Sequence, residues 1–380
     1  MPQPTVAVVG GGQLARMMQQ AAIGLQVHLV ALVEDSGSAT AQVVPDSVVG
    51  AASDGEALTA IASRADVLTF EHEHVPNDVL AAIRAAGHAV EPGPEALLHA
   101  QDKIAMRERL TALDVPCPRW AVARTPDDVA AFGARVGWPV VAKTPRGGYD
   151  GKGVAIVHDG EQVPFPMGPD TPVLLEERVP FTRELAALVA RRPSGEMRTW
   201  PVVQTIQRDG VCAEVLSPAP DLDPSTARAA EGIARLVAEG LGVTGVLAVE
   251  LFLEEGEEHG GRLSVNELAM RPHNSGHVTI DAHTTSQFEQ HLRAVLDLPL
   301  GATDQRERVA VMANLLGSEL GDPADAYPAL MAELPHVKVH LYGKEVRPGR
   351  KLGHVTAVGD DLDMARAQAA RAVALLSGED

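Results

Sequence analysis

The sequence of 380 residues predicts a protein of mixed α/β and α+β class, with a parallel sheet first, a small lobe next and a larger, mostly antiparallel sheet last. Three observations predict this order. Short β-branched runs alternate with Ala-rich helical stretches near the N-terminus, which is the βαβ rhythm of a parallel sheet. A glycine-rich turn then separates two short strands. Finally, two apolar runs flank an acidic turn, which is a hairpin signal.

The first domain is expected over residues 1–98, up to a Pro/Gly cluster that breaks the alternating pattern. Its expected strands are 6–9, 27–33 and 67–70, and its expected helices are 13–23, 55–63 and 79–86. The small lobe is expected over residues 99–175. One expected helix includes residues 101–113, and a second lies around 127–136. The expected strands are 139–143 and 154–157.

The large domain is expected over residues 176–380, as an antiparallel sheet with helices on it. Its expected strands are 173–176 at the junction, 183–190, 200–205, 246–253, 263–268, 309–315 and 337–341. Its expected helices are 224–241, 286–296 and 363–376.

Composition excludes several classes of function. The chain has 32 basic and 51 acidic residues, a net charge of -19, and only 3% aromatic residues, so nucleic acid is not expected as a ligand. No apolar run approaches the ~18 residues of a membrane span. Cys117 and Cys212 lie far apart, without zinc-ligand spacing, which fits a reducing compartment. Because no basic residue precedes the first apolar run, as it would in a signal peptide, we expect a cytoplasmic protein.

The first glycine cluster, Gly10 to Gly12, follows an expected strand and opens a helix. With Ala15 it fits G-x-G-x-x-A, and the acidic pair at 34–35 lies near the place of a ribose-binding carboxylate, so an NAD(P)-dependent dehydrogenase is one hypothesis. A tight turn that needs glycine for packing explains the cluster equally well.

Four ionisable residues, 71–74, end the strand at 67–70. A metal site is one interpretation, but alternation along a strand lets at most two of the four converge, and a solvated loop is the other. Open α/β sheets bind ligands at this edge, so Glu71 and Glu73 are candidates for contacting substrate hydroxyls.

The second glycine cluster, over residues 147–153, is more specific. A strand delivers Lys143 to it, Lys152 lies inside it, and Lys103 precedes it at the start of an expected helix. Together these residues suit a triphosphate. Taken singly, each has another interpretation: Lys103 could be a solvated surface lysine, and the glycine-rich loop could be a plain hairpin. The pattern is not a P-loop, because no Gly-Lys-Ser/Thr opens a helix.

Two carboxylates, Glu250 and Glu267, lie on the two expected strands of the hairpin. If they pair across it, their side chains share one face about 5 Å apart, which is costly unless a cation lies between them. Mg²⁺ takes one or two carboxylates plus phosphate oxygens.

Two basic segments, 271–277 and 344–351, are suited to binding anions. For the second segment, a surface loop without a ligand is the alternative.

In this order the motifs resemble the ATP-grasp superfamily, and within it the N5-carboxyaminoimidazole ribonucleotide synthases, over nearly the whole chain. The most specific matches are 147–153, 266–269, 271–277, 286–289 and 344–351. The resemblance implies an ATP-grasp fold with a Rossmann-like N-terminal domain, a small lid, and a larger domain that holds ATP against the lid.

The resemblance also implies the roles of residues. It assigns ATP to Lys103, Lys143, Gly148, Tyr149, Asp150, Gly151, Lys152, Gly153, Val154, Glu176, Glu177, Arg178, Val179, Glu184, Gln207, Asn266 and Glu267. It assigns Mg²⁺ to Glu250 and Glu267. It assigns 5-aminoimidazole ribonucleotide to Gln13, Glu73, Tyr149, Asp150, Lys344, Arg347 and Arg350, with the phosphate near Lys344 and Arg350. It assigns catalysis to Lys143, Asp150, Arg271, His273 and Asn274, where Asp150 and His273 are alternative proton acceptors.

The activity implied is an ATP-dependent carbon–nitrogen ligation in purine biosynthesis. Bicarbonate and ATP would give carboxyphosphate, which would carboxylate the ribonucleotide, with release of ADP and phosphate. The resemblance also suggests a homodimer. Alternatives are another ATP-grasp ligase or transformylase with a different ribonucleotide, the dehydrogenase above, and a non-catalytic nucleotide-binding regulator.

Overall fold

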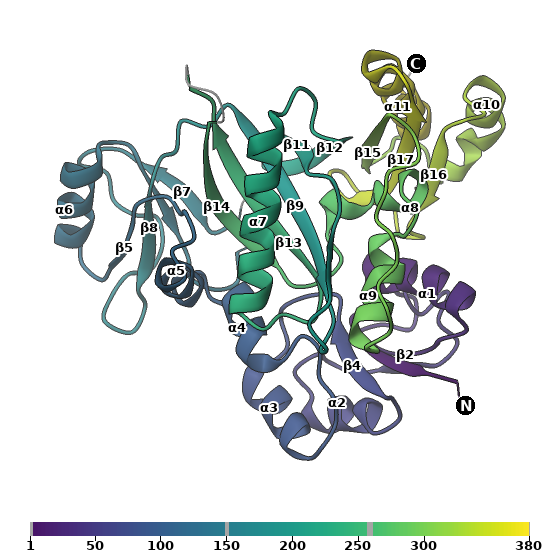
Figure 1. Cartoon of the computed structure of the whole chain (residues 1–380), viewed down its shortest axis with the longest axis horizontal. Helices are drawn as coiled ribbons and strands as arrows, with labels where there is room; N and C mark the ends of the chain where they lie inside the picture. Colours follow the sequence, from purple (N-terminus) through teal and green to yellow (C-terminus); the bar gives the residue numbers. More distant parts are fainter. Residues whose placement is uncertain (1–2, 149–151, 257–260, 380) are drawn as a thin grey trace.

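The computed structural model describes residues 3–148, 152–256 and 261–379, and it arranges them around three sheets (Figure 1). The expected parallel sheet and the expected antiparallel sheet are both confirmed. Within the described residues, none of the helices combines the length and apolarity that spanning a membrane requires.

The N-terminal sheet is parallel, with the strand order β3-β2-β1-β4. Residues 6–9 of β1 are completely buried, as expected for a strand covered on both faces. The elements of this part are β1 (Thr5–Val9), α1 (Gln13–Leu25), β2 (His28–Val33), β3 (Ser47–Val49), α2 (Gly55–Ala62), β4 (Val67–Phe70), α3 (Asn77–Ala85) and α4 (Pro94–Gln101).

A break at Asp102 separates α4 from α5 (Lys103–Ala112), where the sequence predicts one helix over 101–113. The Asp102 carboxylate accepts hydrogen bonds from the backbone N–H groups of Ile104 and Ala105, at 3.0 and 3.1 Å, and so caps α5. Lys103 is therefore the first residue of α5. Arg107 follows one turn later, on the same side of the helix.

The small lobe is a second sheet, of order β5-β8-β6-β7, with all neighbours antiparallel. Its elements are β5 (Trp120–Ala123), α6 (Pro126–Val136), β6 (Val140–Lys143), β7 (Val154–Val157) and β8 (Val173–Glu177). The glycine-rich segment joins β6 to β7, so the lobe holds Lys143 at the end of a strand.

The large sheet has the order β14-β13-β9-β11-β12-β15-β17-β16, and β10 pairs with β9. Its strands are β9 (Arg183–Arg191), β10 (Met197–Thr199), β11 (Val203–Arg208), β12 (Val211–Ser217), β13 (Gly245–Glu254), β14 (Arg262–Ala269), β15 (Val309–Leu316), β16 (Lys338–Leu341) and β17 (Lys351–Gly359). Its helices are α7 (Pro224–Gly240), η1 (Asn274–Gly276), α8 (Thr279–Ala282), α9 (Gln287–Val295), η2 (Pro323–Ala326), α10 (Tyr327–Glu333) and α11 (Leu362–Ser377).

Helices cover both faces of this sheet. Alternate residues of β9 point to opposite sides: Leu185 joins the cluster that contains α7, and Ala186 joins the cluster that contains α9. Helix α9 also packs against α1, which ties the large sheet to the N-terminal sheet (Figure 1).

Other sequence-based expectations differ from the structure in detail. The strand predicted at 200–205 begins only at Val203, because Trp200 turns inward and its indole N–H donates to the carbonyl of Thr285 at 3.0 Å. Strand β17 begins at Lys351, the last residue of the basic segment, and has no predicted counterpart; the same holds for β3, β5, β10 and β12. The divisions expected after residues 98 and 175 fall inside α4 and β8, so the domain boundaries stay predictions.

Candidate active site

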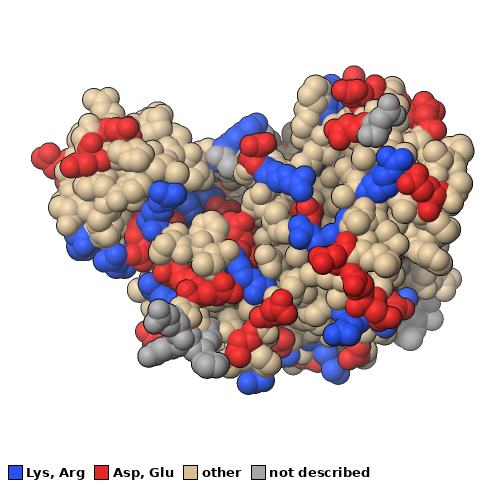
Figure 2. Space-filling model, turned by 90° about the horizontal axis from the view of Figure 1, so that it is seen from above, with Lys and Arg blue, Asp and Glu red and all other residues tan. Residues whose placement is uncertain are grey.

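A cleft of about 1120 Å³ lies between the small lobe and the β13–β14 end of the large sheet, with residues of the N-terminal domain at one side. Figure 2 shows Lys, Arg, Asp and Glu side chains gathered along the hollow beside the lobe. Most of the described residues that the sequence assigns to ATP line this cleft, including Lys103, Lys143, Glu184 and Glu267.

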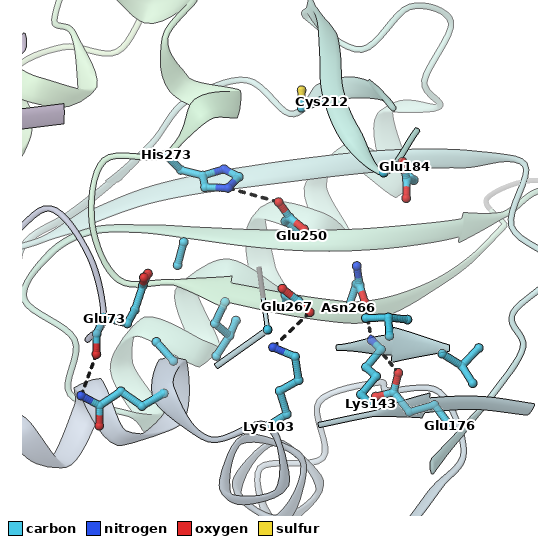
Figure 3. A pocket seen from close by; sticks show the side chains of 18 of the residues that line it. Glu73, Lys103, Lys143, Glu176, Glu184, Cys212, Glu250, Asn266, Glu267 and His273 are labelled. Carbon is cyan, nitrogen blue, oxygen red and sulfur yellow. Dashed lines mark hydrogen bonds and ion pairs between the residues drawn. The ribbon is translucent and has the colours of Figure 1, made fainter. Parts of the chain in front are cut away.

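Lys143 lies where the lobe meets the large sheet (Figure 3). Its ammonium group is 2.8 Å from a carboxylate oxygen of Glu176 on β8, and it donates to the side-chain oxygen of Asn266 on β14 at 3.0 Å. Lys143 and Glu176 are both buried. An ammonium group has three donors, so this lysine keeps one for a ligand in the cleft.

Glu250 and Glu267 lie opposite each other in the register of β13 and β14. Burial, together with the charges of Glu267 and Glu184, raises the pKa of Glu250 to about 8. Lys103 lies 3.4 Å from Glu267, and His273 lies 3.2 Å from Glu250 (Figure 3). A carboxyl group with a raised pKa beside a second carboxylate fits a divalent cation, because the cation would remove the cost of ionising both groups.

The segment after β14 brings a neutral histidine and an unsatisfied amide to the cleft. Burial, with the charges of Arg271 and Lys351, lowers the pKa of His273 to about 3. Gln287 fixes the segment, because its side chain accepts from the backbone N–H of His273 and donates to the carbonyl of His273, both at 2.8 Å. The amide of Asn274 is buried, and neither of its polar atoms has a hydrogen-bond partner among the described residues. These groups suit a small polar ligand.

An apolar slot occupies the outer part of the cleft. Phe252 stacks on Phe181, with ring centroids 4.5 Å apart. Opposite them, Val154 and Ile156 of β7 are 38% and 53% exposed and line the cleft. Exposed apolar side chains around a cleft indicate a flat apolar ligand. Residues 177–179, at the end of β8 and the start of the connection to β9, border the same cleft.

Glu184 lies at the edge of this slot. Burial raises the pKa of its carboxyl group, and a hydrogen bond from the side chain of Gln207 opposes that shift. Both side chains line the cleft, so the structure brings together these two sequence-predicted residues.

A second group of sequence-predicted residues forms around Lys344, outside the set that lines the cleft. Its ammonium group donates to the side-chain oxygen of Gln13 at 2.5 Å. Burial and the charges of Arg350 and Lys351 lower the pKa of Lys344 to about 8, and the charge of Glu71 opposes this shift. The structure therefore brings Gln13, Lys344 and Arg350 into one electrostatic neighbourhood.

Other predicted substrate residues have partners within the chain. Arg347 is exposed, and its guanidinium binds the carboxylate of Glu345, with contacts of 2.5 and 3.1 Å. Glu73 lines the cleft and pairs with Arg271 at 2.9 Å. The ion pair connects the N-terminal sheet edge to the segment that carries His273.

Glu71 was also a candidate for substrate hydroxyls, and the structure corrects this. Its buried carboxylate accepts hydrogen bonds from the backbone N–H groups of Gly12, Leu14 and Ala15, the last two at 3.1 and 3.0 Å. A Cβ at Gly10 would lie 2.3 Å from the Glu71 side chain. The glycine cluster therefore accommodates a carboxylate of the chain itself at the position where a dinucleotide would place its pyrophosphate, which argues against the dehydrogenase hypothesis.

Part of the second glycine cluster lies outside the described residues, namely Tyr149, Asp150 and Gly151. In the described part, the backbone N–H of Thr144 donates to the carbonyl of Gly153 at 2.8 Å. A Cβ at Gly148 would lie 2.6 Å from the carbonyl oxygen of Lys152, so the two ends of the loop approach each other closely.

Sequence reasoning missed several residues near the cleft. Lys351, Cys212 and the slot residues Phe181, Phe252 and Ile156 line it, and Arg107 lies behind it in contact with Glu176. Lys351 was visible only as one cation of a basic run. Nothing in the sequence pattern marks Arg107, since arginine on a helix is common at the surface. Within residues 3–148, 152–256 and 261–379, no group of three or more His, Cys, Asp or Glu side chains could hold a metal ion. Residues 71–74, for which a metal site was one interpretation, form no such group.

Three family models match consecutive parts of the chain. They are the ribonucleotide synthetase preATP-grasp domain over residues 3–101, the ATP-grasp domain over 108–288, and the phosphoribosylaminoimidazole carboxylase C-terminal domain over 310–368. A curated relative from Mycobacterium bovis, N5-carboxyaminoimidazole ribonucleotide synthase, is 53% identical over 367 residues, which cover 94% of this chain and 84% of the relative.

Solved structures are similar over the full length. An ADP complex of an N5-carboxyaminoimidazole ribonucleotide synthetase matches with a TM-score of 0.89 and 31% identity, covering 100% of this chain and 98% of the other. The Aspergillus clavatus synthase, in complex with ADP and 5-aminoimidazole ribonucleotide, matches with a TM-score of 0.87 and 29% identity, covering 98% of each chain.

Proposed function

The chain belongs to the N5-carboxyaminoimidazole ribonucleotide synthase family of ATP-grasp enzymes, and we propose that the residues of the cleft described above carry out that family's reaction. The reaction is the ATP-dependent carboxylation of 5-aminoimidazole ribonucleotide with bicarbonate, a ligation in purine biosynthesis. The observation that carries the assignment of residues is the convergence of Lys103, Lys143 and the Glu250–Glu267 pair in one cleft.

ATP would bind with its base in the apolar slot between Phe252 and β7, and with its ribose near Glu184. Its phosphates would then extend toward Lys143 and Lys103. Lys103 now lies 3.4 Å from Glu267, and a phosphate group would offer it a stronger anionic partner.

Glu250 and Glu267 are the residues that would hold Mg²⁺, which supplies neutralisation of the charge on the transferring phosphoryl group. Their paired carboxylates, whose side chains are 30% and 38% exposed at the cleft, support this assignment, because a cation between them would relieve their mutual repulsion. Lys143 would add its own charge from the opposite side of the cleft.

In the first step, an oxygen of bicarbonate attacks the γ-phosphorus of ATP, the bond to the ADP oxygen breaks, and carboxyphosphate forms. The unsatisfied Asn274 amide and the neutral His273 would hold bicarbonate in place, beside Arg271. Carboxyphosphate then releases phosphate and CO₂. The cleft must exclude water at this stage, since water would capture the intermediate.

In the second step, the exocyclic amine of the ribonucleotide attacks CO₂ and loses a proton. Asp150 and His273 are the alternative acceptors of that proton, and the low pKa of His273, about 3, makes its unprotonated imidazole a weaker base than that of an ordinary histidine. The phosphate of the ribonucleotide would bind near Lys344 and Arg350, assisted by Gln13, and Glu73 would contact its ribose. Arg347 is a weaker candidate because Glu345 already pairs with it.

Homodimer formation, a cytoplasmic location and the three domain ranges are further proposals. The homodimer follows from the family resemblance, and the cytoplasmic location follows from the cysteine usage of the sequence. The domain ranges follow from the places where the pattern of expected helices and strands changes.

The test is ADP release by the purified protein with Mg²⁺ and ATP, with the ribonucleotide and bicarbonate each present or omitted. We expect release that requires the ribonucleotide and rises with bicarbonate, together with the carboxylated product. ATP binding without stimulation by the ribonucleotide would reject the proposed acceptor and leave another ATP-grasp ligase activity as the alternative.

A further inference from the structure

Arg107 is completely buried behind the cleft, at the point where α5, the small lobe and the large sheet meet. Its guanidinium donates to one carboxylate oxygen of Glu176 on β8 at 2.5 Å and to the backbone carbonyl of Asn266 on β14 at 2.7 Å. The other carboxylate oxygen of Glu176 faces Lys143 at 2.8 Å. One carboxylate is thus shared between two cations, and only one of these cations borders the cleft.

The charges of this cluster do not cancel. Arg107 and Lys143 carry two positive charges, and Glu176 carries one negative charge. Burial alone would raise the pKa of Glu176, but Arg107 and Lys143 together lower it to about 2, so the carboxylate is ionised at neutral pH. The cluster therefore keeps one net positive charge in a buried setting, where Coulomb interactions are stronger than in water.

Without Arg107, the balance would change. Lys143 and Glu176 would form a neutral one-to-one pair, and the ammonium group would be held by the carboxylate. A phosphate group entering the cleft would then meet a lysine whose charge is already compensated. Arg107 prevents this because it holds half of the carboxylate from behind.

We propose that Arg107 is a positioning residue for ATP: by sharing the Glu176 carboxylate, it keeps the charge of Lys143 available for the phosphates of the nucleotide. This inference rests on the proposed role of Lys143 in binding ATP. Arg107 also fixes the backbone of Asn266, whose side chain accepts from Lys143 and which precedes Glu267. It thus joins the phosphate-binding lysine of the lobe to the strand that carries the proposed metal ligand.

The first experiment is steady-state kinetics of Arg107→Met, which has a similar length and no charge. We expect the KM for ATP to rise at least about tenfold, the order of one charge-assisted hydrogen bond, with little change in the KM for the ribonucleotide. Arg107→Lys keeps the charge, and its KM for ATP should stay within about threefold of the wild-type value. A comparable rise in both variants would overturn the charge argument.

The decisive comparison is the double variant Arg107→Met/Glu176→Gln, which restores one net positive charge in the cluster. We expect its KM for ATP to return toward the wild-type value, whereas a role in packing alone predicts a double variant worse than Arg107→Met. Absence of this recovery in a protein that melts cooperatively would overturn the proposal. If Arg107→Met does not fold, Arg107→Gln takes its place as the uncharged variant, with the same expected rise in the KM for ATP.

Two further variants separate the possible failures. Arg109→Met is the matched control, because Arg109 lies on the same helix, is exposed, and is outside the residues that line the cleft. Its guanidinium donates to the carbonyl of Gly240 at 2.7 Å, and the kinetics of this variant should be unchanged. Lys143→Met should raise the KM for ATP. If it does not, the assignment of Lys143 to ATP fails and this inference fails with it. If it does, while Arg107→Met behaves as wild type, only the inference about Arg107 fails.

Discussion

At the scale of single residues, burial changes what Lys344 can do. Its ammonium group is removed from water, and burial lowers the pKa of Lys344 to about 8, although Glu71 counteracts the shift. A lysine with this pKa is charged at neutral pH and becomes neutral as the pH rises through about 8. Because the proposed phosphate site depends on that charge, substrate capture should depend on pH.

We therefore expect kcat/KM for 5-aminoimidazole ribonucleotide to decrease above pH 8, approaching a tenfold loss per pH unit, about as a single deprotonation requires. Since kcat/KM reports the ionisation of the free enzyme, the profile for ATP, which binds elsewhere, should lack this contribution. Lys344→Arg is the control: an arginine stays charged over this range, so its alkaline decrease should disappear. An unchanged alkaline limb in Lys344→Arg would contradict the assignment.

The residues that the sequence predicts and those that it misses differ in kind. Glu250 and Glu267 could be found because alternation along two strands of a hairpin decides which side chains share a face. Lys143 could be found because it ends an apolar strand beside glycines. Arg107 could not, since its importance comes from contacts with β8 and β14, which are distant in the sequence.

At the scale of elements, the N-terminus of α1 is satisfied from within the chain. The carboxylate of Glu71, at the end of β4, accepts from the backbone N–H groups of Gly12, Leu14 and Ala15. Helix N-termini attract anions because their first N–H groups have no partner within the helix. Sequence periodicity identifies the turn and the helix, but it does not show which anion fills the site.

This arrangement predicts a specific behaviour of Glu71→Ala. The variant should lose about 1–3 kcal/mol of unfolding free energy, because buried N–H groups lose their acceptor. Sulfate at tens of millimolar should raise its melting temperature more than that of the wild type, since the emptied site can hold an anion. Thermal unfolding with sulfate or with chloride at equal ionic strength measures both effects. Equal sulfate responses in the two proteins would show that Glu71 does not occupy an anion site.

Elements formed mainly through long-range pairing were the hardest to predict. Strand β17 follows a Pro- and Gly-containing basic run, and its pairing with β15 joins segments that are separated by η2 and α10. The break between α4 and α5 depends on one cap, Asp102, inside an otherwise continuous helical pattern. By contrast, β1, α1 and β4 have strong local patterns and match their predicted ranges closely.

At the scale of the whole molecule, the cleft joins parts of the chain that belong to different sheets. Lys143 belongs to the lobe, Glu250 and Glu267 belong to the large sheet, and Lys103 begins the helix that follows the N-terminal domain. A nucleotide bound here would link these parts in the folded state only. Ligands that bind only the folded state stabilise it by mass action, by about 2.7 kcal/mol at a hundredfold excess over Kd.

Thermal unfolding should therefore report the nucleotide and the metal separately. In the wild type, Mg²⁺ with ATP should raise the melting temperature by several degrees more than ATP alone, because a cation between Glu250 and Glu267 also contacts phosphate oxygens. Glu267→Gln should retain a cooperative transition, lose the increment due to Mg²⁺, and turn over ATP at least about a thousandfold more slowly, as expected from the loss of several kcal/mol of charge stabilisation. Glu255→Gln changes an exposed carboxylate outside the residues that line the cleft and serves as the control, with both the increment and the turnover intact. A full Mg²⁺ increment in Glu267→Gln, or retained turnover, would place the metal on other residues.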